Sequence, residues 1–203
     1  MKKHHFWGIV VATALLATLL ILLPNQSEYQ APVRSSGVAL IGGDFNLQHV
    51  NKPLVQDSEF RGRFMLVYFG YTYCPDVCPV DVQKMALALD ILGERGVDLD
   101  AIQPLFITLD PERDNADIMQ TYASAYHPRI MGLTGTPEQI DVVKKAYRVY
   151  SRKAPQPGTD EYLVDHSNYI YLMGPDGAFL KHFTALDTHE TIANGVEKFM
   201  ALN

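Results

Sequence analysis

The sequence is poor in cysteine and carries no excess of positive charge. Only two of its 203 residues are cysteines, and 17 Lys and Arg face 23 Asp and Glu, giving a formal net charge of −6. A protein that binds nucleic acid needs a basic surface to neutralise phosphates, so that class is excluded. A disulfide framework is also excluded, because two closely spaced cysteines close a short loop and stabilise a fold little. With 47% hydrophobic and 20% charged residues, the chain still has the composition of a globular protein.

The longest stretch without charge lies near the N-terminus. Residues 6–23 read FWGIVVATALLATLLILL, which predicts a transmembrane anchor helix. Lys2 and Lys3 precede it, so the positive-inside rule predicts residues 1–5 in the cytoplasm. A cleaved signal peptide is the alternative, but the run is long for its apolar core and no small-residue cleavage site follows. The short N-terminus predicts a single-pass protein of the bacterial inner membrane, with its C-terminal part in the periplasm. No cysteine follows the run to accept a lipid.

The rest of the chain is predicted as a linker and one domain. Residues 24–40 are polar and contain Pro, Ser and Gly, which is typical of a tether. Residues 41–203 show no second break in composition. A continuous apolar run at 64–70 predicts a central strand buried on both faces, and IQPLFITL (residues 102–109) predicts another buried strand.

Strands and helices are expected to alternate along this domain. The helix after the cysteines is expected to bury Val80, Met85, Leu87, Leu89 and Leu92 and to end at Gly93 or Gly96. The other expected elements are a hairpin near residues 42–55, a helix capped by Asp114 and running to Tyr126, a short strand in 129–135, a helix from Thr136 to Tyr147, strands at 169–173 and 178–183, and a final helix from near Thr188. This order predicts an α/β, thioredoxin-like mixed sheet flanked by helices.

The two cysteines lie where a buried strand gives way to a helix, in FGYTYCPDVCPVD (residues 69–81). Free N–H groups and the helix dipole stabilise a thiolate at such a position. Pro75 is expected at the first helical position. On a helix, the Cβ atoms of Cys74 and Cys78 would lie roughly 5–6 Å apart, whereas a disulfide needs about 3.8 Å. The spacing favours a shared metal ion and leaves a redox dithiol open.

His166 is the candidate third ligand. It stands in LVDHSNYIYLM (residues 163–173), just before a strand that is expected to lie beside strand 64–70. That position would bring it to the sheet edge that carries the cysteines. His4 and His5 are predicted on the cytoplasmic side of the anchor, and the four remaining histidines are predicted at the surface: His49, His127, His182 and His189.

Two thiolates and an imidazole form a soft ligand set that favours Cu(I) or zinc. Structural zinc usually takes four protein ligands, and only three candidates are found, so copper is preferred. Asp110, at the end of a strand, and Asp165, next to the histidine, are candidates for a second layer around the ligands. Tyr71 and Tyr73 are expected to cover the cysteines.

Three motifs in the same order resemble the Sco/SenC family of copper chaperones for cytochrome c oxidase. They are FGYTYCPDVCP (69–79), ITLDPERD (107–114) and YLVDHSNYIYLMGPDGAFL (162–180). The resemblance covers residues 41–203. It implies a thioredoxin-like fold in which Cys74, Cys78 and His166 bind Cu(I) or Cu(II). The implied partner is the oxidase subunit that carries the binuclear CuA site, and a chaperone also needs an upstream copper donor.

The resulting prediction is a metallochaperone rather than an enzyme, with no catalytic residue assigned. The alternative is a membrane-anchored thiol–disulfide oxidoreductase that reduces the acceptor's cysteines, or acts in redox signalling, through a mixed disulfide. Reductases of the thioredoxin type carry a cis-proline where Asp165, His166 and Ser167 stand here. A peroxiredoxin-type peroxidase is disfavoured, because its nucleophile follows a threonine by three positions, and Thr72 precedes Cys74 by two.

Overall fold

The computed structural model describes residues 40–202 and places a five-stranded mixed sheet at the centre of the domain. The strand order is β5-β4-β3-β8-β9. Central β3 (Phe64–Gly70) pairs in parallel with β4 (Ile102–Thr108) and antiparallel with β8 (Ile170–Met173). Every residue of β3 and β4 is buried, as their continuous apolar runs predict. The edge strands are β5 (Met131–Leu133) and β9 (Phe179–Phe183).

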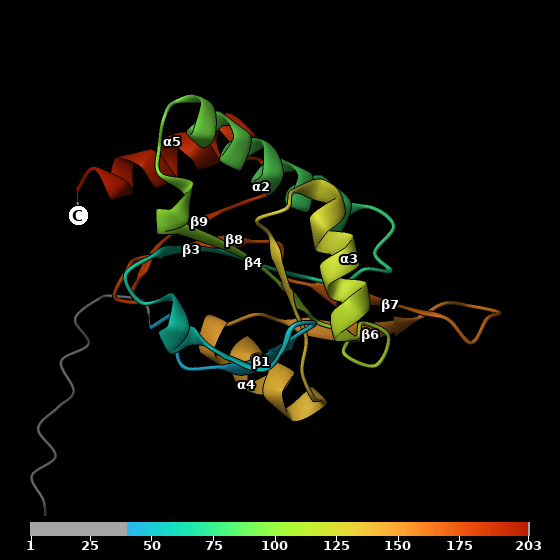
Figure 1. Cartoon of the computed structure of the whole chain (residues 1–203). Coiled ribbons are helices and arrows are strands. Elements are labelled where there is room, and N and C mark those ends of the chain that lie inside the picture. Colours follow the sequence, from blue (N-terminus) through green and yellow to red (C-terminus); the bar gives the residue numbers. More distant parts are fainter. Residues whose placement is uncertain (1–39, 203) are drawn as a thin grey trace, which may run out of the picture. The chain divides into compact units, whose positions relative to one another are not determined.

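Helices cover both faces of this sheet (Figure 1). On one face α2 (Val77–Glu94) packs with α5 (His189–Met200), and α4 (Pro137–Tyr147) lies on the other. The expected N-terminal hairpin is present as β1 (Asn46–His49) and β2 (Lys52–Gln56). Helix α3 (Ala116–Tyr126) approaches β5 so closely that a Cβ on Gly132 would lie 2.4 Å from the Met119 carbonyl oxygen. Two short 3-10 helices complete the domain, η1 (Asp57–Phe60) and η2 (Leu99–Ala101). The predicted mixed sheet between two layers of helices is confirmed.

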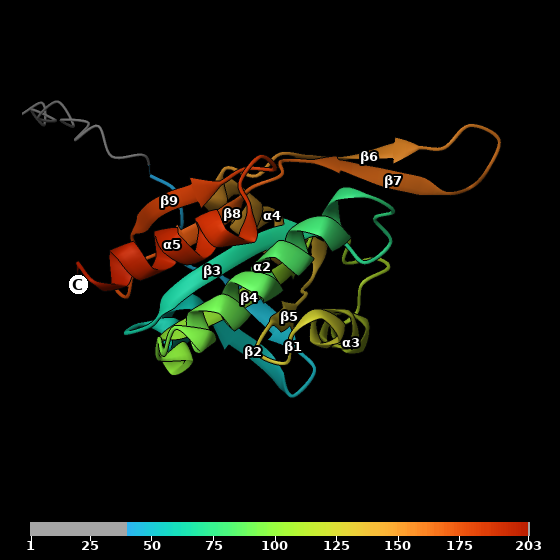
Figure 2. The ribbon, with the colours of Figure 1, turned by 90° about the horizontal axis from the view of Figure 1, so that it is seen from above.

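The sequence patterns did not predict the hairpin between α4 and β8. Strands β6 (Ser151–Pro155) and β7 (Tyr162–His166) form a two-stranded sheet of their own. Figure 2 shows the pair extending away from the helices and the central sheet. Its strand β6 carries exposed Arg152 and Lys153, and its other three residues are half-exposed or exposed. It therefore lacks the apolar alternation that predicts a strand.

Two of the four α-helices begin where the sequence predicts. Helices α4 and α5 begin after Thr136 and Thr188, as predicted, and both threonines cap them through their side chains. The cap of α3 is Asn115, which accepts the N–H of Ile118; the prediction of Asp114 is wrong because that carboxylate is buried and bound elsewhere. Helix α2 begins at Val77, so Pro75 lies before it and not at its first position.

The buried face of α2 also differs in part from the expected one. Met85, Leu89 and Leu92 are buried as predicted, but Val80 is 51% and Leu87 36% exposed. Cys78, Val82, Ala86 and Ala88 complete the face that meets the sheet. Some of the apolar side chains of α2 are therefore left exposed to solvent.

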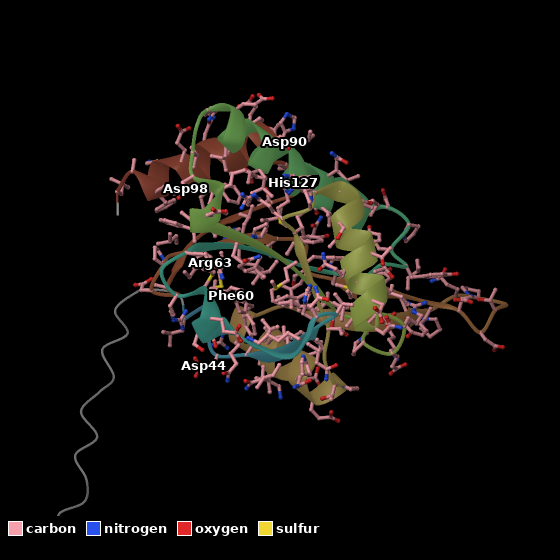
Figure 3. The ribbon with its side chains drawn as sticks, viewed as in Figure 1. Asp44, Phe60, Arg63, Asp90, Asp98 and His127 are labelled. Carbon is pink, nitrogen blue, oxygen red and sulfur yellow. The ribbon has the colours of Figure 1, made fainter. Side chains whose placement is uncertain are left out.

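One histidine predicted at the surface is largely covered. His127, just after α3, keeps only 12% of its side chain exposed, and its Nε2 lies 3.6 Å from the Asp90 carboxylate of α2 (Figure 3). Burial lowers the pKa of His127, and the nearby Asp90 opposes that shift. Its partner is distant in sequence, which is why the local pattern did not reveal it.

Within residues 40–202, no helix has the length and apolar character needed to cross a bilayer. The anchor expected at 6–23, the N-terminal residues 1–5 and all of the expected linker except Leu40 lie outside the described residues.

Candidate metal centre

Three potential ligand atoms meet beyond the carboxyl end of β3. The sulfurs of Cys74 and Cys78 and a ring nitrogen of His166 all lie within 4.8 Å of one another. Cys78 Sγ and His166 Nε2 are 3.4 Å apart. The structure thus brings together the three residues that the sequence singled out, from a loop, a helix and a hairpin.

The cysteine segment is fixed between β3 and α2. Gly70 ends β3 directly beneath Cys78, where an added Cβ would lie 2.9 Å from the Cys78 sulfur. Cys74 lies in the loop before α2, and its sulfur accepts the backbone N–H of Cys78 at 3.4 Å. Asp76, at the N-cap of α2, makes no side-chain capping bond. The Cys74 sulfur therefore satisfies one of the free amides at the helix start.

Asp114 ties the same loop to the sheet. Its carboxylate accepts the backbone N–H and the hydroxyl of Thr72, and the hydroxyl of Thr108 on β4. Asp114 is fully buried. The sequence showed Asp114 only as a helix-cap candidate, because its partner Thr72 is 42 residues away. Its observed contacts make it the buried support of the loop that leads to Cys74.

The pKa values of the two thiols are shifted in opposite directions. The pKa of Cys74 is lowered, chiefly because Cys78 donates a hydrogen bond to its sulfur, with further help from backbone N–H groups. The pKa of Cys78 is raised by its closeness to the Cys74 thiolate and by burial. The pair therefore holds one thiolate, on Cys74, and one thiol, on buried Cys78.

His166 presents the correct nitrogen to the cysteines. Its Nδ1 lies 2.9 Å from the backbone oxygen of Ser167. A carbonyl oxygen only accepts, so Nδ1 carries the proton and the lone pair of Nε2 faces the sulfurs. The rings of Tyr68 and Tyr71 meet the imidazole edge-on, at centroid distances of 6.4 and 6.1 Å. Metal-binding histidines are commonly oriented by such a bond from the second ring nitrogen.

The site opens to solvent on one side. A hollow of about 430 Å³ borders it and is lined by residues 71, 74–77 and 163–166. Cys74 is partly exposed there, whereas Cys78 is buried behind it. A metal ion or a partner's sulfur approaching through the hollow would meet Cys74 first.

The other candidates surround this centre without replacing its ligands. Asp110 is 1% exposed, and its carboxylate is bound by the Arg113 guanidinium and the Tyr162 hydroxyl. Asp165 accepts a hydrogen bond from Arg152 at 3.0 Å, while the partner of His166 Nδ1 is the Ser167 carbonyl. A role of Asp165 in orienting the histidine stays a prediction that these contacts do not support.

The two tyrosines expected to cover the cysteines differ from each other. Tyr71 is buried, and its hydroxyl accepts the backbone N–H of Val164 on β7. Tyr73 is 54% exposed, with the Arg113 guanidinium 4.7 Å from its ring centroid. Tyr71 thus links the cysteine segment to the hairpin that carries His166.

The SCO1/SenC family model matches residues 33–201. The chain belongs to the SCO1/SenC family. The matched range includes both cysteines, the 107–114 motif and the histidine. The family resemblance read from the three sequence motifs is confirmed.

Individual SCO1/SenC proteins agree with this assignment. SenC of Rhodobacter capsulatus is 40% identical over 194 residues, which cover 94% of this chain and 86% of SenC. The mitochondrial SCO1 homologue of Mus musculus is 41% identical over 167 residues, 82% of this chain but only 58% of that longer protein. The crystal structure of Arabidopsis thaliana ScoI with copper bound superposes with a TM-score of 0.74 at 39% identity, covering 80% of this chain and 99% of that one. This protein shares the thioredoxin-like α/β fold of that Sco structure.

Proposed function

We propose that this protein is a copper chaperone that binds one copper ion through Cys74, Cys78 and His166 and delivers it to cytochrome c oxidase. The observation that carries the proposal is the convergence of the three ligand atoms within 4.8 Å. The Arabidopsis relative with the same fold binds copper. Copper is here the cargo of the protein.

The ligand set fits this cargo chemically. Two sulfurs and one imidazole nitrogen match the soft-ligand preference of Cu(I). The Nδ1–H of His166 already donates to Ser167, so Nε2 needs no change of tautomer to bind a metal ion. Because Cys74 borders the open hollow, an acceptor thiolate can bind copper there while Cys78 and His166 still hold it.

The acceptor in this proposal is the oxidase subunit that carries the binuclear CuA site, and an upstream donor supplies the copper. The domain spans residues 41–203. It is held at the bacterial inner membrane by residues 6–23 and a tether at 24–40, with the N-terminus in the cytoplasm and the domain in the periplasm. The bacterial SenC relative, which aligns along most of both chains, supports this setting. A reporter enzyme active only in the periplasm, fused after residue 203, checks the orientation.

A copper titration tests the proposed function. The full chain in detergent, reduced under anaerobic conditions, is titrated with Cu(I) against a chromogenic Cu(I) chelator. One tightly held copper per chain, with weaker binding in Cys74→Ser, Cys78→Ser and His166→Ala, supports the proposal. A wild-type protein that leaves all the copper with a weak chelator contradicts it.

The asymmetry of the two thiols favours a second candidate function, thiol–disulfide reduction. The Cys74 thiolate would attack one sulfur of a substrate disulfide and release the other as a thiolate. Cys78, after losing its proton, would then attack Cys74 in the mixed disulfide, so that the substrate gains two electrons and the pair forms a disulfide. The partly exposed, low-pKa Cys74 and the buried Cys78 suit these two roles.

His166→Ala separates the two functions, because the histidine is a ligand for copper but forms no bond in the disulfide exchange. A chaperone loses copper affinity in this variant. A reductase keeps most of its rate of reducing a model protein disulfide.

A further inference from the structure

The hairpin that carries His166 stands outside the central sheet. Within the described residues, β7 pairs only with β6, and this pair forms a separate two-stranded sheet. Side chains alternate along a strand, so Tyr162, Val164 and His166 lie on the same face of β7. Whatever holds Tyr162 and Val164 against the domain therefore also sets the position of His166.

Tyr162 is held by two residues of the loop after β4. Its hydroxyl donates to Asp110 Oδ1 at 2.8 Å. Its backbone oxygen accepts from Arg113 Nη1 at 3.0 Å, and the Arg113 guanidinium carbon lies 3.8 Å from its ring centroid. Arg113 Nε in turn bonds the buried carboxylate of Asp110. One guanidinium thus binds a strand backbone, an aromatic ring and a carboxylate at once, which requires its planar fork of donors.

The cysteine segment supplies the second attachment. Val164 donates its backbone N–H to the Tyr71 hydroxyl at 3.1 Å, and the Arg113 guanidinium carbon lies 5.9 Å from the Tyr71 ring centroid. Arg113 is therefore in contact with both sides, the loop before Cys74 and the hairpin that ends in His166. Two further ion pairs join hairpin and loop: Arg113 lies 3.8 Å from the exposed carboxylate of Glu161, and Lys153 pairs with Glu112, both about half exposed. Such surface pairs contribute little.

We propose that Arg113 is a positioning residue that, together with Asp110 and Tyr162, fastens the β6–β7 hairpin to the loop after β4 and so keeps His166 within reach of the cysteines. This inference rests on the proposed copper-binding function. Arg113 touches neither sulfur nor imidazole in this role. It determines whether the third ligand is available.

A double-mutant cycle tests the proposal. Cu(I) and Cu(II) affinities of the full chain in detergent are measured for the wild type, Arg113→Ala, His166→Ala and the double variant. We expect Arg113→Ala to weaken copper binding by about 10–100-fold, as loss of partners around a metal ligand generally does. The same change should weaken it less than about 3-fold when His166 is already absent. Equal losses in both backgrounds, or no loss in the first, would overturn the proposal.

Milder variants guard against a protein that simply fails to fold. Tyr162→Phe removes only the hydroxyl that donates to Asp110, and Arg113→Lys keeps the charge but loses the fork. Both are expected to lie between the wild type and Arg113→Ala in copper affinity. Arg152→Ala is the matched control, because Arg152 lies in the same hairpin and pairs with exposed Asp165. Its copper affinity should equal that of the wild type, and a loss as large as that of Arg113→Ala would contradict the proposal.

A measurement without copper completes the test. Amide hydrogen exchange of residues 162–166 in the copper-free protein should be faster in Arg113→Ala than in the wild type or in Arg152→Ala. If the wild type binds no copper while exchange still changes as expected, the proposed function fails and the attachment of the hairpin stands. If exchange is unchanged in Arg113→Ala, the attachment itself is refuted.

Discussion

The cysteines and the histidine of this centre are held by two very different regions. Cys78 belongs to α2 and lies over Gly70 at the end of the fully buried strand β3. His166 belongs to a two-stranded hairpin outside the central sheet, attached by hydrogen bonds and by stacking of one arginine on one tyrosine. Close packing holds the first region. The second depends on a few polar contacts and on one buried apolar side chain, Val164, and so few contacts can open separately from the core.

This difference suits the proposed copper chaperone, which must both bind and release a metal ion. Both sulfurs belong to the segment that leads from β3 into α2, whereas the position of the imidazole depends on the attachment of the hairpin. The ligands should therefore respond unequally to mutation, and the predictions below probe that inequality in order of expected effect.

The largest effect is expected for Cys78→Ser. This change removes a thiolate ligand from the rigid region, so copper affinity should fall by more than about 100-fold, beyond the range known for partners around a ligand. Competition with a chromogenic Cu(I) chelator measures the loss. A variant that keeps affinity within tenfold of the wild type would show that Cys78 is not a ligand.

His166→Ala should weaken Cu(I) binding less than Cys78→Ser, because both thiolates remain. Loss of the imidazole should affect Cu(II) more strongly than Cu(I), since imidazole nitrogen suits Cu(II) better than a pair of soft thiolates alone. Paired affinities for the two oxidation states provide the check. Identical losses for both would contradict the assigned role of the histidine.

Gly70→Ala probes the rigid region by packing. The new methyl group would lie 2.9 Å from both Cys78 Sγ and Tyr68, inside a filled core, so the free energy of unfolding should fall by about 1–3 kcal/mol. Urea denaturation measures it.

Gly158→Ala is the matched change in the hairpin turn. An added Cβ meets no atom within 4 Å there, and the strain that alanine takes on at a φ of 81° stays within the turn. Its copper affinity should stay at the wild-type value, whereas that of Gly70→Ala should fall as Cys78 is displaced. Similar copper affinities for the two variants would remove the contrast between the regions.

The smallest effect is expected in the number of protons that copper binding releases. Near pH 7 the lowered pKa of Cys74 makes it a thiolate, while the raised pKa of Cys78 keeps its proton. Copper binding should therefore release about one proton per ion, and affinity should rise about tenfold per pH unit while Cys78 stays protonated in the free protein. Indicator titration in weak buffer counts the protons. Release of two, or of none, would refute the opposite shifts.

Local patterns were sufficient for the central strands and for the candidate ligands. The runs at 64–70 and 102–108 became buried strands, and Cys74, Cys78 and His166 meet as the motifs indicated. What the patterns missed depends on partners distant in sequence. Asp114 resembles a helix cap until its bonds to Thr72 are known, and Asp110 acts on the hairpin through Tyr162, 52 residues away. The β6–β7 hairpin itself buries little apolar surface, so it leaves little hydrophobic signal.

The most direct test of the account is X-ray absorption at the copper edge of the Cu(I)-loaded protein. We predict two sulfur neighbours and one imidazole nitrogen around the metal in the wild type. The nitrogen should disappear in His166→Ala and be diminished in Arg113→Ala, with both sulfurs retained. A copper ion surrounded by sulfur alone in the wild type, or one without sulfur, would contradict the assignment of Cys74, Cys78 and His166 as its ligands.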